Sequence, residues 1–196
     1  ILYNILGSAY QNIGELGYAK EIFNKGIKMD PNNISIMNNL ANTFKQIGEE
    51  NAAENLYQKI IEKNPKYINA YINYGNLKKD ANDYKEAIEL YNKALNLNNH
   101  MPVIYYSISL AYQGIGDFNL AIEYANKTLL IEPKFTQADL LISQITKYKE
   151  NDSHFIEMKS KIDKLELNEN QSVNLNFALA KAYEDINKIK ESFKHL

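Results

Sequence analysis

Residues 34–67 read ISIMNNLANTFKQIGEENAAENLYQKIIEKNPKY, and the pattern of this stretch recurs along the chain at a fixed interval of 34 residues. Four separate sets of positions keep that interval. They are Gly7, Ala41, Gly75 and Ser109; Gly14, Gly48, Asn82 and Gly116; Ala19, Ala53, Ala87 and Ala121; and Pro31, Pro65, Asn99 and Pro133. Such a period indicates an array of like structural units that pack against their neighbours.

Each set has a physical role in a pair of helices. The Gly7 and Ala19 sets are small residues that allow two helices to approach closely, and larger apolar residues recur around them at helical spacing. The Gly14 set marks the end of a first helix, because Gly and Asn adopt the left-handed conformation of a helix C-cap. The prolines end the second helix. The predicted pairs are 1–13 with 15–28, 34–47 with 50–63, 68–81 with 84–97, and 102–115 with 118–131.

These positions follow a known repeat signature. Its residues here are Leu6, Gly7, Tyr10, Ala19, Phe23 and Pro31, and then Leu40, Ala41, Phe44, Ala53, Tyr57 and Pro65. In them the chain resembles the tetratricopeptide repeat (TPR) family. The resemblance implies an all-α fold, a right-handed α-solenoid of stacked helix–turn–helix TPR repeats. Two positions depart from the signature, Lys78 in the third repeat, where an aromatic residue is usual, and Ala125 in the fourth.

The repeat weakens after residue 133. We expect four regular repeats over 1–133, a degenerate repeat over 134–168 and a partial repeat over 169–196 that is truncated at its C-terminal end. In the degenerate repeat, residues 135–149 are predicted to form a first helix and 153–166 its partner. Phe155 stands there where the Ala19 set requires a small residue.

A second resemblance covers roughly the last 50 residues. The segment from Tyr148 to Phe193, which includes NFALAKAYED at 176–185, is similar to a segment of bacterial TPR-containing sulfotransferases. There it joins the repeats to a C-terminal sulfotransferase domain. The resemblance implies that this chain is the substrate-presenting N-terminal arm of a sulfotransferase or another transferase, with the catalytic domain beyond residue 196.

Composition narrows the function classes. All 22 basic residues are Lys, and bidentate reading of phosphate or guanine is a property of Arg, so nucleic acid is a poor partner. The net charge is −2 and no block of like charges suggests a membrane surface. Without Cys there is no disulfide or thiolate zinc site. No signal peptide or membrane-spanning run is seen, so a cytoplasmic protein is expected, although the start at Ile1 indicates a piece of a longer chain.

No residue pattern typical of catalysis, metal binding or cofactor binding was found, so this segment is predicted not to be an enzyme. His100, His154 and His195 are isolated in sequence and are predicted to be solvated surface residues. The stretch 114–116, Gly-Ile-Gly, fits a helix end better than a phosphate loop, because no strand precedes it.

The densest acidic stretch, which runs from Asp80 to Glu89, is also predicted to have a structural role and no chemical one. Asp83 is predicted to cap a helix, with Glu86 at the capping-box position and both Glu86 and Glu89 on a solvated face. The alternative is a cation site or an acid–base pair.

The first helices of a repeat array line its concave side. Asn39 with Asn42, and Asn73 with Asn76, are three residues apart and therefore share one helix face. A ladder of carboxamides offers donors and acceptors to the backbone of an extended peptide, whatever its side chains. The pattern resembles the asparagine ladder in the repeats of O-linked N-acetylglucosamine transferases.

We therefore predict a protein–protein interaction scaffold whose groove binds an extended peptide or a partner protein. The groove is predicted to comprise Asn4, Ser8, Asn38, Asn39, Asn42, Lys45, Asn73, Asn76, Lys79, Tyr106 and Gln113. Its two lysines favour an acidic partner. The alternatives are a merely solvated face in an Asn-rich protein and self-association through one end of the array.

Overall fold

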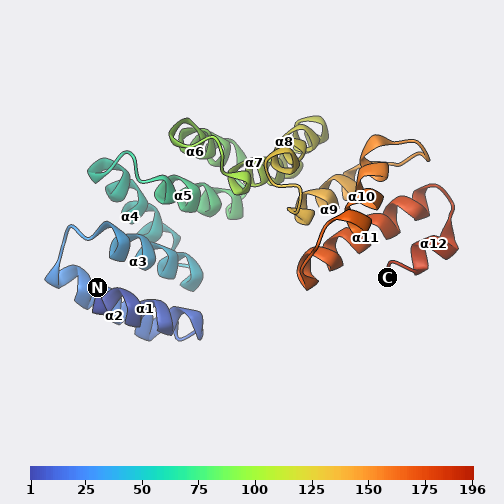
Figure 1. Cartoon of the computed structure of the whole chain (residues 1–196). Coiled ribbons are helices and arrows are strands. Elements are labelled where there is room, and N and C mark those ends of the chain that lie inside the picture. The colour runs from blue at the N-terminus through green and yellow to red at the C-terminus, as the bar shows by residue number, and fades with distance from the viewer. The chain divides into compact units, whose positions relative to one another are not determined.

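The computed structural model describes residues 1–196 and contains twelve helices and no strand (Figure 1). The chain divides into two compact units, residues 1–99 and residues 100–196. No helix is both long enough and apolar enough to cross a membrane. These helices confirm the predicted fold class, all-α and built from stacked helix–turn–helix repeats.

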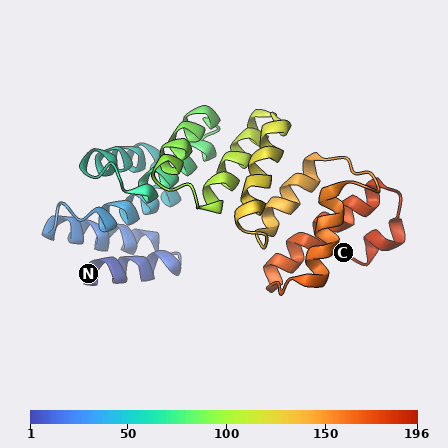
Figure 2. The same cartoon turned by 45° about the horizontal axis from the view of Figure 1, so that its top comes forward.

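The first unit consists of three helix pairs that stack in chain order from the N-terminus (Figure 2). The helices are α1 (Leu2–Asn12), α2 (Leu16–Met29), α3 (Ile34–Ile47), α4 (Glu50–Lys63), α5 (Ile68–Asp80) and α6 (Tyr84–Leu97). The second unit contains α7 (Pro102–Ile115), α8 (Phe118–Ile131), α9 (Thr136–Ile145), α10 (Ser153–Lys164), α11 (Glu169–Asp185) and α12 (Ile189–Phe193). The eight helices predicted in the regular repeats are confirmed, each to within one residue at either end.

The turn within each regular pair uses a left-handed residue, as the sequence predicts. Gly14, Gly48 and Gly116 have φ values of +82°, +90° and +87°, and Asn82 takes the same role with φ of +62°. An L-residue other than Asn is strained in this conformation, so these positions set where the first helix ends.

Small residues let the two helices of a pair meet. A Cβ atom built on Gly7 would lie 2.4 Å from Cε1 of Phe23, and one on Gly75 would lie 2.6 Å from Cε1 of Tyr91. Ala19, Ala53, Ala87 and Ala121 of the facing helices are fully buried. The aromatic ring of the second helix thus lies directly on the backbone of the first helix.

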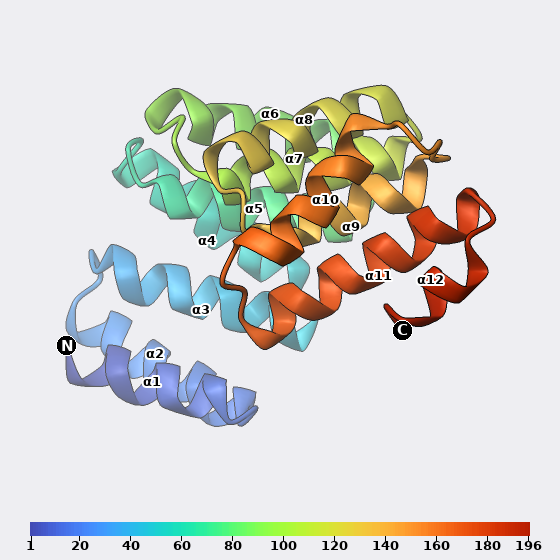
Figure 3. The ribbon, with the colours of Figure 1, turned by 45° about the vertical axis from the view of Figure 1, so that its right-hand side comes forward.

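The degenerate repeat does not form the predicted pair. α9 packs between α8 and α11, and α10 packs on α11 instead of pairing closely with α9. Phe155 is the physical reason, because a bulky ring at the small position keeps α10 from approaching α9. Ala178 and Ala182 of α11 are small and fully buried, so α11 takes the place beside α9. α12 folds back on the end of α11 (Figure 3).

Long polar side chains link α10 to α9 instead. Asp139 of α9 is fully buried, and its Oδ1 accepts hydrogen bonds from His154 Nε2 at 3.0 Å and from Lys161 Nζ at 2.6 Å. The other ring nitrogen of His154, Nδ1, is hydrogen-bonded to the Tyr148 hydroxyl at 2.6 Å. The prediction that His154 is a solvated surface residue is therefore wrong. A fully buried carboxylate requires such partners, and these hydrogen bonds hold α10 against α9.

Replacing Gly75, which contacts Tyr91, and replacing Gly17, where an added methyl group contacts nothing, should change the free energy of unfolding in opposite directions. Gly75→Ala should lower the free energy of unfolding by about 1 kcal/mol, because its methyl group displaces the Tyr91 ring. The cost is modest because the second repeat accommodates Ala41 at the same position. Gly17→Ala, with nothing within 4 Å of the new methyl group, should instead stabilise the chain by up to about 1 kcal/mol. Urea unfolding followed by circular dichroism measures both, and equal effects would contradict the packing.

Candidate functional site

The candidate site is the surface of the first unit formed by α1, α3 and α5, which we call the first-helix face. α1 contacts α3, and α3 contacts α5, so the three helices lie next to one another (Figure 1). Nine of the predicted groove residues lie on these three helices, namely Asn4, Ser8, Asn38, Asn39, Asn42, Lys45, Asn73, Asn76 and Lys79. The other two, Tyr106 and Gln113, lie on α7 of the second unit.

Hydrogen bonds between side chains connect neighbouring repeats across this face. Asn39 Nδ2 donates to Asn4 Oδ1 at 2.8 Å and to Ser8 Oγ at 3.3 Å. One repeat further along, Asn73 Nδ2 donates to Asn38 Oδ1 at 3.0 Å. Asn38 is only 6% exposed, so it supports Asn73 from below the surface.

A second set of bonds comes from the tyrosines of the following helix. The Tyr57 hydroxyl of α4 donates to Asn42 Oδ1 at 2.6 Å, and the Tyr91 hydroxyl of α6 donates to Asn76 Oδ1 at 2.7 Å. Both tyrosines are fully buried, whereas both asparagines are half-buried and reach the surface. Burial raises the pKa of Tyr57, so its hydroxyl stays protonated and donates.

The C-terminal end of the face carries the charge. Lys45 Nζ lies 2.6 Å from one Asp80 oxygen and Lys79 Nζ lies 2.9 Å from the other. Burial raises the pKa of Asp80, but the hydrogen bonds from Lys45 and Lys79 outweigh burial and hold the pKa below its ordinary value. Two cations share one carboxylate, which leaves a positive charge at this end. Gln11 and Gln46 join beside it through a 3.0 Å hydrogen bond.

The two predicted residues of the second unit have different surroundings. The ring of Tyr106 is half-buried and packs against Phe135, with ring centroids 5.0 Å apart. Burial raises the pKa of Tyr106. Gln113 is half-buried near the end of α7.

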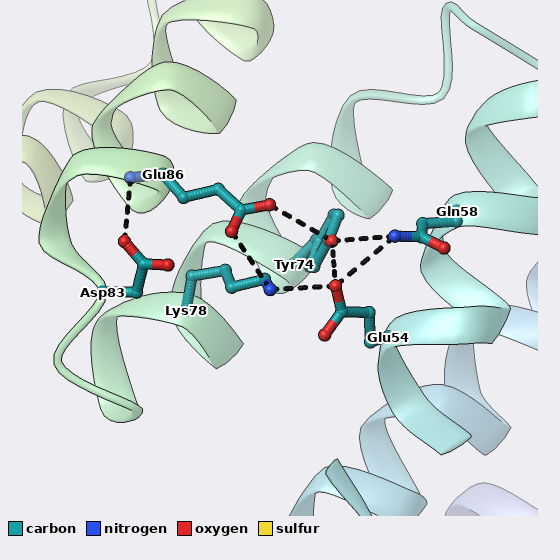
Figure 4. A network of polar contacts seen from close by, with 6 residues as sticks. All are labelled: Glu54, Gln58, Tyr74, Lys78, Asp83 and Glu86. Atoms are coloured by element: carbon teal, nitrogen blue, oxygen red, sulfur yellow. Dashed lines mark hydrogen bonds and ion pairs between the residues drawn. The ribbon is translucent and has the colours of Figure 1, made fainter. Parts of the chain in front are cut away.

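A polar cluster that the sequence did not predict joins α4, α5 and α6 (Figure 4). Lys78 Nζ lies 2.8 Å from Glu54 and 3.0 Å from Glu86. The Tyr74 hydroxyl is 2.5 Å from Glu54, 3.3 Å from Glu86 and 3.1 Å from Nε2 of Gln58. Lys78 thus replaces the usual aromatic residue with an ionic link between neighbouring repeats. The departure of Lys78 from the repeat signature was the one sequence sign of it.

This cluster also corrects the interpretation of the acidic stretch. Asp83 does cap α6, accepting from the Glu86 backbone nitrogen at 3.3 Å. The Glu86 side chain, however, neither completes a capping box nor lies free on a solvated face, because Lys78 and Tyr74 bind it.

The pKa values in the cluster follow from its contacts. Burial raises the pKa of Glu54, but the hydrogen bonds from Lys78 and Tyr74 outweigh burial. The pKa of Glu54 is therefore below the ordinary 4.5. Burial, followed by the hydrogen bond to Glu54, raises the pKa of Tyr74 to about 12. Burial lowers the pKa of Lys78, but the hydrogen bonds to Glu54 and Glu86 outweigh it and raise the pKa overall.

The low pKa of Glu54 predicts an acid-dependent stability. A carboxylate with a lowered folded-state pKa stabilises the fold above its unfolded pKa, and the gain is lost as the pH falls through the folded-state pKa. Lys78→Met should therefore cost about 1 kcal/mol at pH 7, the upper end for partly exposed ion pairs, and should flatten the loss of stability as the pH falls from 4.5 through the lower folded-state pKa of Glu54. Lys85→Met, at an exposed residue of α6, is the control. Parallel curves of urea midpoint against pH for the wild type and Lys78→Met would contradict the ionic link.

The second unit contains a separate hollow between two of its helices. It is a cavity of about 560 Å³ in the second unit, between α8 and α10, lined by Leu129, His154 and Lys161 among others. An extended chain binds along an open surface and requires no enclosed cavity.

The repeats match models of a known protein family. Models described as tetratricopeptide repeat match residues 2–33, 22–55, 56–89 and 102–135, and one described as TPR repeat matches residues 75–116. The chain belongs to the tetratricopeptide repeat family. The TPR chain is thus a helical-repeat scaffold of the class that carries protein interactions. The recognition of the family from the sequence is confirmed.

Solved structures share the TPR fold. MamA is 25% identical, with a TM-score of 0.64 over 93% of this chain and 95% of MamA. PilF of Pseudomonas aeruginosa is 21% identical, with a TM-score of 0.75 over 97% of this chain and 87% of PilF. YrrB, described as a TPR protein with an unusual peptide-binding site, is 17% identical, with a TM-score of 0.63 over 88% of each chain. No curated protein matches the sequence.

Proposed function

We propose that this TPR chain is a protein-interaction module whose first-helix face binds an extended segment of a partner protein. The observation that carries the proposal is the row of half-buried carboxamides Asn39, Asn42, Asn73 and Asn76. Each has one polar atom bound within the chain and one polar atom without a partner in the chain. A partner backbone is the ligand that supplies both donors and acceptors at regular intervals along a strand.

The energy of such a row suits a reversible interaction. A hydrogen bond contributes about 0.5–1.5 kcal/mol net, so four of them supply about 2–6 kcal/mol before the cost of association. Side chains of the partner must add to this sum. The surplus positive charge of Lys45 and Lys79 around Asp80 favours a partner with an acidic residue at that end. The likeness to YrrB, which is described as having a peptide-binding site, agrees with this proposal.

A peptide selection tests the proposal. A phage-displayed library of random twelve-residue peptides, selected on the wild-type chain, should yield binders. Replacing Asn39, Asn42, Asn73 and Asn76 together by Ala should weaken the binding of these peptides by about tenfold or more, since about 1.4 kcal/mol corresponds to a factor of ten. Fluorescence polarisation with a labelled peptide measures the change.

The matched control replaces three exposed asparagines of the second helices, Asn51, Asn55 and Asn92, by Ala. The control should bind as the wild type does, and circular dichroism should show the same helicity for all three proteins. Peptides that bind the fourfold variant as tightly as the wild type would remove the first-helix face as the site.

A second proposal is a transferase arm, supported by the similarity of residues 148–193 to the segment that precedes a sulfotransferase domain. In that case the first-helix face would hold the protein to be sulfated. Reading the coding sequence after Leu196 tests it. A Gly/Ser/Thr-rich phosphosulfate-binding loop in the following domain would support it, and a stop codon or further repeats would reject it.

A further inference from the structure

Two buried tyrosines determine how two asparagines present their carboxamides. The hydroxyls of Tyr57 and Tyr91 lie inside the helix pairs and donate to Oδ1 of Asn42 and Asn76. A carboxamide that holds its oxygen toward the interior must direct its NH₂ group away from it. Nδ2 of Asn42 and Nδ2 of Asn76 donate to no other residue of the chain. Each is therefore a donor left for a partner.

The asparagines one turn earlier have the opposite arrangement. Both donate through Nδ2 to the preceding repeat: Asn39 donates to Asn4 and Ser8, and Asn73 donates to Asn38. Their Oδ1 atoms accept no side-chain hydrogen bond from the chain and remain as acceptors. α3 and α5 therefore carry the same ordered pair, an acceptor followed three residues later by a donor.

The repeats without this pair act as internal comparisons. Asn42 and Tyr57 are fifteen residues apart, as are Asn76 and Tyr91. In the first repeat the same two positions hold Ser8 and Phe23, and in the fourth they hold Leu110 and Ala125; neither pair has both the carboxamide and the hydroxyl. The tyrosine hydroxyl occurs where a carboxamide is present to receive it, whereas packing alone is satisfied by Phe23, which is equally buried.

From this geometry we propose that Tyr57 and Tyr91 are positioning residues that fix the polarity of the first-helix face, so that each of α3 and α5 binds the N–H and C=O of one residue in an extended partner. The inference rests on the proposed function and adds the chemistry of recognition. An extended residue presents its N–H and C=O on the same side, as residues of a hydrogen-bonded pair in a sheet do. Asn39 or Asn73 accepts from the N–H, and Asn42 or Asn76 donates to the C=O. Recognition therefore depends on the main chain of the partner. Proline, which lacks the N–H, should not bind at the two partner positions that contact α3 and α5.

A polarity reversal tests the inference. Asn42→Asp with Asn76→Asp keeps the shape and still accepts from the two tyrosines, but it replaces the free donors by acceptors that face the partner's carbonyls. Peptides selected on the wild type should bind this variant about tenfold or more weakly. The control, Asn51→Asp with Asn92→Asp, adds the same charge at exposed second-helix positions and should bind as the wild type does. Measurement at high salt reduces the effect of the added charge.

The role of the hydroxyls needs its own readout. Tyr57→Phe with Tyr91→Phe should fold normally, because Phe23 fills the same position in the first repeat. In ¹⁵N-labelled protein without peptide, the side-chain NH₂ signals of Asn42 and Asn76 should shift, whereas those of Asn39 and Asn73 should stay. Binding of the selected peptides should weaken severalfold, because the freed carboxamides rotate. Tyr74→Phe, at a hydroxyl that serves the Glu54 cluster, should leave these signals and the binding unchanged.

The outcomes separate the two claims. Wild-type binding by the double Asp variant, or unmoved Asn42 and Asn76 signals in the double Phe variant, overturns the polarity inference and leaves the peptide-binding face standing. A wild-type chain that selects no peptide overturns the proposed function and the inference with it. In the selected peptides, N-methylation of one backbone nitrogen at a time should reduce binding at a small number of positions. Tolerance at every position would also overturn the inference.

Discussion

The packing of the first unit depends on the close contact between a small residue of one helix and an aromatic ring of the next. At Gly7 and Gly75 the ring of Phe23 or Tyr91 occupies the space in which a Cβ atom would stand. The ring position recurs every 34 residues as Phe23, Tyr57 and Tyr91, which makes the three helix pairs of the first unit alike so that they can stack, whereas the fourth pair has Ala125 there. In the proposed function the contact has a second role, because a tyrosine ring packed there carries its hydroxyl to Asn42 or Asn76 of the first-helix face. A second small position, that of Ala19, Ala53, Ala87 and Ala121, is filled by Phe155 in the degenerate repeat, and there α10 packs on α11 instead of pairing with α9.

Apolar packing within the pairs is joined by polar links between them, and those links differ in kind. On the first-helix face, the Asn39–Asn4 and Asn73–Asn38 bonds each use one half of a carboxamide and leave the other half exposed. On the other side of α5, Lys78 satisfies two carboxylates and leaves little for a partner. The proposed binding surface thus differs from the Lys78 cluster in its unbound polar groups, even though both are rich in polar residues.

The fold could be predicted almost entirely from the sequence, because a repeat of fixed length makes each signal appear four times. The helix ends, the left-handed turns and the cap at Asp83 all follow from such signals. The candidate site could be predicted only as a set of positions on one face. A carboxamide is both donor and acceptor, so the sequence does not show which half of Asn42 faces outward; that depends on Tyr57, fifteen residues away. His154 and Lys161 were missed for the same reason, since their partner Asp139 lies on another helix.

The most direct test of the account is to titrate a selected peptide into ¹⁵N-labelled protein and follow both backbone and side-chain amide signals. The account predicts that the largest changes occur on α3 and α5, with the NH₂ groups of Asn42 and Asn76 shifting toward the positions of stronger hydrogen bonds. Changes concentrated on α4 and α6, or around the hollow between α8 and α10, with those two NH₂ groups unmoved, would contradict it.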